Sequence, residues 1–210
     1  MASMSKAVLT PKQGGAVHEP APEYSHGGDV SILGFWFFLA TDLLIFACLF
    51  ATFVILRTHT DGGPTGSAIF DVNGFVAETF ILLTSSFTCG LATFALRKGK
   101  RKAALSWLGA TILLGIAFVG LEISEFIHDA AIGATAQRSA FLSGFFTLVG
   151  THGAHVSMGI LWMCSVFYQI WRRGIHPVRA RKLFLVGLYW HFLDIVWVFI
   201  FTVVYMMGVV

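Results

Sequence analysis

The chain has 210 residues, of which 56% are hydrophobic and only 12% are charged, and its formal net charge is +3. Soluble domains carry roughly 25% charged residues, so this chain has too few polar side chains to cover a water-facing surface. The composition excludes an ordinary soluble domain and predicts a membrane protein.

The N-terminal segment, residues 1–30, holds three of the five prolines, four glycines and few large apolar side chains. Such a segment cannot bury enough apolar surface to offset the entropy lost on ordering. We therefore expect a disordered tail. It has no apolar core followed by a small-residue cleavage site, so we do not expect a cleaved signal peptide.

Five long apolar stretches follow, at residues 31–56, 75–96, 104–127, 140–171 and 183–208. A helix needs about 20 apolar residues to cross roughly 30 Å of hydrocarbon. None of the five stretches contains proline or lysine. Because a backbone in lipid must satisfy its own hydrogen bonds, we expect helices rather than isolated strands. The sequence predicts an all-α fold, with one domain of five transmembrane helices over residues 31–210.

The links between these stretches differ in charge. The second link, RKGKRKA, and the fourth, RRGIHPVRARK, are strongly basic, whereas the first and third contain only Arg57 and Arg138. Lysine and arginine are enriched in cytoplasmic loops of membrane proteins. The pattern therefore predicts a cytoplasmic N-terminus and a periplasmic C-terminus. An odd number of spans, five, also requires the two termini to lie on opposite sides of the membrane.

Eight ionisable side chains fall inside the predicted helices: Asp42, Glu78, Glu122, Glu125, His152, His155, His191 and Asp194. A charged residue at the centre of a membrane helix costs roughly 2.5–3.5 kcal/mol on insertion scales. The carboxyl groups must therefore be protonated, paired with histidine, or placed near the head groups.

Helical spacing places these residues on polar stripes that we expect to face neighbouring helices. The stripe of stretch 75–96 contains Glu78, Ser85 and Cys89; that of 104–127 contains Thr111, Gly115, Glu122 and Glu125; that of 183–208 contains His191, Asp194, Thr202 and Tyr205. Counting from the helix ends, the three glutamates lie in the outer third of the membrane. The three histidines and two aspartates lie near its middle, where we expect them to pair with one another.

Three interpretations of these residues compete. A metal or haem site could use His152, His155, His191 and Asp194, but no cysteine or further well-spaced ligand joins them. A proton or ion path could run through the five helices, with Asp42 as the most carrier-like residue. The interpretation we favour is a hydrogen-bonded network that fixes helix packing.

Several segments resemble haem-copper oxidase subunit III: LATDLLIF (39–46), SEF (124–126), VGTHGAHVSMG (149–159) and YWHFLDIVWVFIFTVVYMMG (189–208). The link GGPTG (62–66) and the segment ETFILLTSS (78–86) resemble the quinol-oxidase branch, cytochrome o ubiquinol oxidase. The five-span architecture, without two further N-terminal helices, is similar to that branch too.

The resemblance implies a non-catalytic subunit III of a proton-pumping ubiquinol oxidase in the bacterial cytoplasmic, or inner, membrane. Haem b, haem o, copper and ubiquinone are then expected in subunit I, and none of them in this chain. Subunit I would be the main contact, with subunits II and IV as further partners and phospholipids in a cleft. The implied roles are assembly, lipid binding and support of proton uptake, and Asp42 takes the place of the family's buried carboxylate.

Three alternatives remain open. One is a stand-alone proton or ion transporter built on Asp42 and the layer of histidines. Another is a membrane metalloenzyme that uses His152, His155 and His191. The third is subunit III of a cytochrome c oxidase, which only the partner subunits distinguish from a quinol oxidase.

Overall fold

The computed structural model describes residues 26–57, 72–133, 135 and 138–206, and within these ranges it contains helices and turns but no strand. The helices are α1 (His26–Leu56), α3 (Val72–Arg97), α4 (Arg101–Ala131), α5 (Ala140–Arg173) and α6 (Pro177–Ile200), followed by the π-helical turn η1 (Phe201–Met206). The all-α prediction is confirmed for these residues. The first 25 residues of the predicted tail and the link GGPTG lie outside them.

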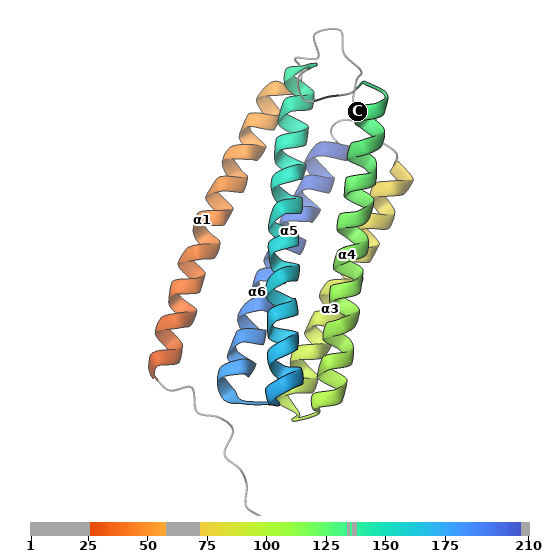
Figure 1. The fold of residues 1–210 in the computed structure, drawn as a ribbon. Coiled ribbons are helices and arrows are strands. Elements are labelled where there is room, and N and C mark those ends of the chain that lie inside the picture. Colours follow the sequence, from red (N-terminus) through yellow and green to blue (C-terminus); the bar gives the residue numbers. More distant parts are fainter. Residues whose placement is uncertain (1–25, 58–71, 134, 136–137, 207–210) are drawn as a thin grey trace, which may run out of the picture.

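The helices form an elongated bundle in which α5 lies centrally (Figure 1). α3 and α4 form an antiparallel pair, α6 packs against both α3 and α5, and α4 packs against α5. α1 stands at the edge of the bundle and packs mainly against α5, with a smaller contact to α6. A side chain on α5 can therefore reach three other helices.

Four of the five helices are long and apolar enough to cross a membrane, over Ile32–Leu56, Gly74–Arg97, Arg101–Ala131 and Pro177–Val204. The five spans predicted from the sequence are thus only partly recovered. α5 is 34 residues long, but the threonines, histidines and glycines along its middle, THGAH among them, lower its apolar character. Its central position explains in part how such a helix is accommodated, because neighbouring helices bury His152 and partly cover Thr151 and His155, whereas Thr147 stays exposed.

The helix bounds differ from the predicted ones at several ends. α1 begins at His26 rather than residue 31, and α4 continues to Ala131. The largest correction concerns the basic fourth link, most of which is helical because α6 begins at Pro177. Proline fits the first position of a helix, since its missing N–H has no partner there. The ring nitrogen Nδ1 of His176 accepts a hydrogen bond from the Val178 amide, 3.4 Å away, and caps this helix start.

Two tight turns join the helices at one end of the bundle. Gly99 (φ 70°) lies between α3 and α4, and Gly174 (φ 73°) lies between α5 and α6. Both angles fall in the left-handed region, which glycine adopts without steric cost. The guanidinium group of Arg101 donates a hydrogen bond to the Trp171 carbonyl and ties the two turns together. Both basic links therefore lie at the same end of the bundle.

Trp190 fills the centre of the bundle and is only 1% exposed. Its ring lies against two glycines: a Cβ atom at Gly115 of α4 would be 2.9 Å from Trp190 Cη2, and one at Gly159 of α5 would be 3.2 Å from Cζ3. The indole Nε1 donates a hydrogen bond to Ser85 Oγ on α3, at 2.9 Å. One side chain of α6 thus contacts α3, α4 and α5.

We predict that Gly115→Ala destabilises the bundle by about 1–3 kcal/mol, because overpacking displaces a rigid indole ring. The measurement is thermal unfolding of the detergent-solubilised protein. Gly120→Ala on the same helix is the matched control, since a Cβ atom there meets nothing within 4 Å. Equal melting temperatures for the two variants would contradict this account of the core.

Candidate functional site

The first polar cluster joins α1 to α5. Asp42 Oδ2 lies 3.9 Å from His155 Nε2, and the two side chains are 7% and 24% exposed. This distance suits an ion pair but is too long for a hydrogen bond. His155 also packs against the ring of Phe46, with centroids 5.2 Å apart. The contact joins α1 to α5 within the predicted membrane spans, and it is an ion pair when the imidazole is protonated.

The hydrogen bonds of His155 determine which ring nitrogen faces Asp42 and whether that nitrogen carries a proton in the neutral ring. Its Nδ1 lies 2.7 Å from the Thr151 carbonyl oxygen, which only accepts, so Nδ1 donates. In the neutral ring, Nε2 is then an acceptor directed at Asp42. The hydroxyl of Tyr189 on α6 donates to the His155 carbonyl at 3.2 Å. Asp42 and His155 therefore form a polar contact between α1 and α5 without a direct hydrogen bond, and this contact also involves α6.

His152 occupies a different environment, one turn away from His155 on the same helix. It is fully buried, and its ring centroid lies 5.2 Å from that of Trp197, 6.0 Å from Phe118 and 6.3 Å from Phe46. Neither ring nitrogen has a hydrogen-bond partner among the described residues. The imidazole is enclosed by aromatic rings and packs against them without forming a hydrogen bond to a described residue.

The three glutamates come together between α3, α4 and α5. Glu78 and Glu122 are 1% and 4% exposed, and Glu125, which is half-buried, is close enough to act electrostatically on both. A Cβ atom at Gly153 of α5 would lie 2.5 Å from both carboxyl oxygens of Glu122. The glycine therefore leaves the space that the Glu122 carboxyl group occupies.

The remaining cluster joins α3 to α6. Ser86 Oγ and His191 Nδ1 are connected by a hydrogen bond of 2.6 Å, and Ser86 also lies close to the carboxyl group of Asp194. Asp194 is 8% exposed, and its Oδ1 has no hydrogen-bond partner within the described residues. His191, by contrast, is exposed on the outer surface of the bundle.

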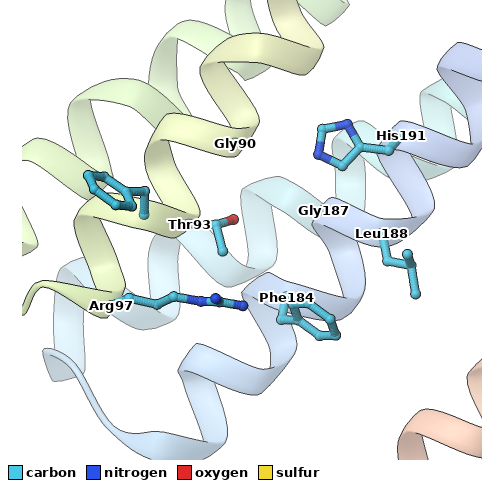
Figure 2. Close-up of a pocket in the computed structure, with 8 residues that line it drawn as sticks. Gly90, Thr93, Arg97, Phe184, Gly187, Leu188 and His191 are labelled. Atoms are coloured by element: carbon cyan, nitrogen blue, oxygen red, sulfur yellow. The ribbon is translucent and has the colours of Figure 1, made fainter.

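Two adjoining hollows extend along this surface between α3 and α6. One, of about 270 Å³, is lined by Gly90, Thr93, Phe94, Arg97, Phe184, Gly187, Leu188 and His191. Figure 2 shows Arg97 reaching across it from α3 toward Phe184 on α6, with His191 at the other end. The second hollow, of about 420 Å³, continues past His191 to Ser86 and Asp194. We call the two together the α3–α6 groove.

The mid-membrane histidines and aspartates, which were predicted to pair with one another, meet in two separate places rather than in one layer. Asp42 pairs with His155, and His191 lies with Asp194 and Ser86 in another place. His152 joins neither group. The stripes on α3 and α4 are turned inward, with Glu78, Ser85, Cys89, Thr111, Gly115 and Glu122 buried. The stripe on α6 is not, because His191 and Thr202 are exposed; the side chain of Tyr205 lies outside the described residues.

Residues 26–209 match the family described as cytochrome c oxidase subunit III. The chain belongs to this family. It is 50% identical to the cytochrome bo(3) ubiquinol oxidase subunit 3 of Pseudomonas aeruginosa over 98% of this chain and 99% of that protein. It is 48% identical to the quinol oxidase subunit 3 of Bacillus subtilis, over 92% and 95% of the two chains. The resemblance inferred from the sequence motifs is thereby confirmed.

Within this subunit III family fold, the described residues contain no group of three or more His, Cys, Asp or Glu side chains arranged to hold a metal ion. The histidines that suggested such a site are divided between separate environments. His152 lies in its aromatic cage, His155 faces Asp42, and His191 faces outward. The spacing of two histidines on α5 therefore reflects a helix face rather than a ligand set.

Three contributing hydroxyl groups were not singled out as site residues from the sequence: Ser86, which bonds His191; Tyr189, which bonds the His155 carbonyl; and Thr79, which accepts from Trp197 Nε1 at 3.1 Å. Each contact crosses from α6 to another helix. Spacing along one helix cannot predict such contacts, because they depend on how two helices cross. The one sequence feature that could have indicated Tyr189 as a site residue is its place two residues before His191 in the YWHFLD segment.

We predict that Asp42 and His155 are energetically coupled by about 0.5–1.5 kcal/mol in a double-mutant cycle. The variants are Asp42→Asn, His155→Gln and their combination, and the readout is the thermal unfolding of the detergent-solubilised protein. Thr41→Ala is the matched control on α1, because the Thr41 hydroxyl bonds only the Phe38 carbonyl of its own helix among the described contacts. Strict additivity of the two single substitutions would contradict the pairing.

Proposed function

We propose that this chain is subunit III of a ubiquinol oxidase that reduces dioxygen to water and pumps protons. The observation that carries the proposal is the similarity to quinol oxidase subunits 3 over almost the whole of both chains. A third relative, the probable quinol oxidase subunit 3 of Staphylococcus aureus, is 46% identical over 89% of this chain.

The proposed role within the complex is structural and supportive rather than catalytic. The ionisable side chains of the bundle are divided among three helix interfaces, none of which gathers a set of metal ligands within the described residues. Haem b, haem o, copper and ubiquinone accordingly belong to subunit I in this proposal. The chain supports assembly, lipid binding and proton uptake, with subunit I as the main contact and subunits II and IV as further partners.

Asp42 and His155 are the residues through which the chain can support proton uptake. The two groups lie 3.9 Å apart, which is too far for a direct hydrogen bond, so a proton passing between them would need a bridging group such as a water molecule. Proton relays within membranes are built from such carboxylate and imidazole groups. The pair also connects α1 to the rest of the bundle, so it combines a structural role with the capacity to hold a proton.

In this proposal all five helices cross the bacterial inner membrane. α5 does so in the middle of the bundle, although it is less apolar than the other four. The two basic turns lie at one end, which we assign to the cytoplasm because lysine and arginine are retained there. The N-terminus is then cytoplasmic and the C-terminus periplasmic.

The decisive test is purification of the tagged chain from its own membranes in a mild detergent. We expect haem b, haem o and copper to co-purify with it, together with ubiquinol oxidation by oxygen. The separated chain should have no haem absorption band and should move no protons in vesicles. A haem spectrum or proton transport by the chain alone would refute the proposal. Oxidation of reduced cytochrome c instead of ubiquinol would assign the chain to a cytochrome c oxidase.

The orientation has its own test, which uses the basic turn between α3 and α4. Replacing Lys98, Lys100 and Lys102 by glutamate should block or invert the insertion of the neighbouring helices, because cytoplasmic positive charge is removed. The readout is the side of the membrane on which a C-terminal reporter is active. Replacement of the same lysines by arginine is the control. An unchanged topology of the glutamate variant would show that charge does not set the orientation.

A further inference from the structure

The α3–α6 groove combines features that acyl chains cannot satisfy. His191 lies near the middle of the span Pro177–Val204 and is exposed there, so its imidazole is not covered by its own chain. Polar side chains at this depth almost always face protein or water rather than lipid. The single hydrogen bond of His191 in the described structure, from Nδ1 to Ser86, leaves Nε2 without one. A polar group from outside the chain is needed at this position.

A second polar group lies beside His191. Asp194 lines the groove next to His191, is 8% exposed and has an unpartnered Oδ1. That Oδ1 is enclosed within the chain, so the group that an outside segment can reach is the imidazole of His191. The mid-membrane part of the groove therefore presents one exposed polar side chain, His191, with the carboxyl group of Asp194 beside it.

The shape of the groove suits side chains of a packed helix. Gly90 opens it, since a Cβ atom there would meet nothing within 4 Å, and Gly187 forms its floor against Cys89 and Thr93. Its first hollow measures about 270 Å³, whereas a cavity of about 150 Å³ is enough to hold a benzene ring. Small residues at such positions allow a neighbouring helix to approach closely.

The surroundings of the groove are apolar and uncovered. Leu83, Phe87, Phe94, Ile195 and Val198 are all exposed along its edges. At the end near the basic turns, Arg97 extends over the Phe184 ring, 5.9 Å from its centroid. An approaching segment would thus meet apolar surface, a polar site at mid-membrane and a cation at the membrane boundary.

We propose that the α3–α6 groove is the docking face for a transmembrane helix of a neighbouring subunit, which places a large side chain over Gly90 and a hydrogen-bonding side chain beside His191. The proposal rests on the proposed function, because it requires a membrane partner. The depth of the polar site decides between a protein helix and a phospholipid. A phospholipid brings polar atoms only to the interface, whereas the exposed imidazole of His191 lies in the middle of the span.

Gly90→Leu tests the groove directly in the intact complex. A Cβ atom at Gly90 meets nothing within 4 Å, and the rest of the leucine would project into the hollow, so docking should fail while the subunit still inserts. We expect the haem recovered per tagged chain to fall at least about fivefold, as for the truncation or obstruction of a central interface contact. Gly120→Leu on α4 is the matched control, because a Cβ atom there also meets nothing within 4 Å and the residue is exposed. It should recover haem at the wild-type level.

Substitutions at His191 give a second, independent test should Gly90→Leu fail to insert. His191→Leu removes the outward polar group and should lower haem recovery, whereas His191→Gln, which keeps a hydrogen-bonding group, should largely restore it. Ser86→Ala removes only the partner within the chain and should have the smaller effect. The amount of each variant in the membrane, measured by immunoblot, serves as the reference.

The outcomes separate the proposals. Wild-type haem recovery by Gly90→Leu or His191→Leu, at normal membrane levels, overturns the docking face but leaves the proposed function intact. If Gly90→Leu keeps its haem and loses tightly bound phospholipid, the groove is a lipid site and the docking proposal is overturned. If the wild-type chain itself recovers no haem, both the proposed function and the docking face fail.

Discussion

The structure depends on one constraint: a polar side chain in hydrocarbon either finds a hydrogen-bonding partner in protein or lowers the stability of the fold. The bundle meets this constraint only in part. Asp42 faces His155 between α1 and α5, the glutamates gather between α3, α4 and α5, and Ser86 bonds His191 between α3 and α6. Both carboxyl oxygens of Glu78 and both ring nitrogens of His152 nevertheless have no hydrogen-bond partner among the described residues. The three interfaces named each contain polar groups that can select a neighbouring helix. Apolar surface alone could not do so, because lipid competes equally well for it.

Close packing around these groups is achieved with glycine and aromatic residues together. Trp190 occupies the space left by Gly115 and Gly159 and still satisfies its N–H through Ser85. His152 is enclosed by Phe46, Phe118 and Trp197. Rings of this kind have few rotatable bonds, so they fill the narrow spaces between helices without a large loss of side-chain entropy. The centre of the bundle is consequently rigid, whereas its outer surface between α3 and α6 remains incomplete.

The sequence predicted the helical fold, the approximate limits of the helices and the inward faces of α3 and α4. These properties follow from apolar runs and from spacing along one helix, as for Glu78 and Ser85, which lie two turns apart and are both buried. The sequence did not predict which polar groups meet, because that depends on the crossing of helices far apart in the chain. His191 was expected to face a neighbour within the bundle, yet it points outward. In the docking proposal, the group that pairs with His191 belongs to another polypeptide.

The low apolar character of α5 has a consequence for biogenesis. α1, α3 and α4 are synthesised before α5, and each is long and apolar enough to cross the bilayer by itself. α5 carries His152, His155 and threonines into the same hydrocarbon. One of the helices that pack against it, α6, is synthesised after it. We therefore expect the membrane integration of α5 to be cooperative, aided by contacts with Asp42 and Glu122 on the earlier helices and completed when α6 packs against its remaining side.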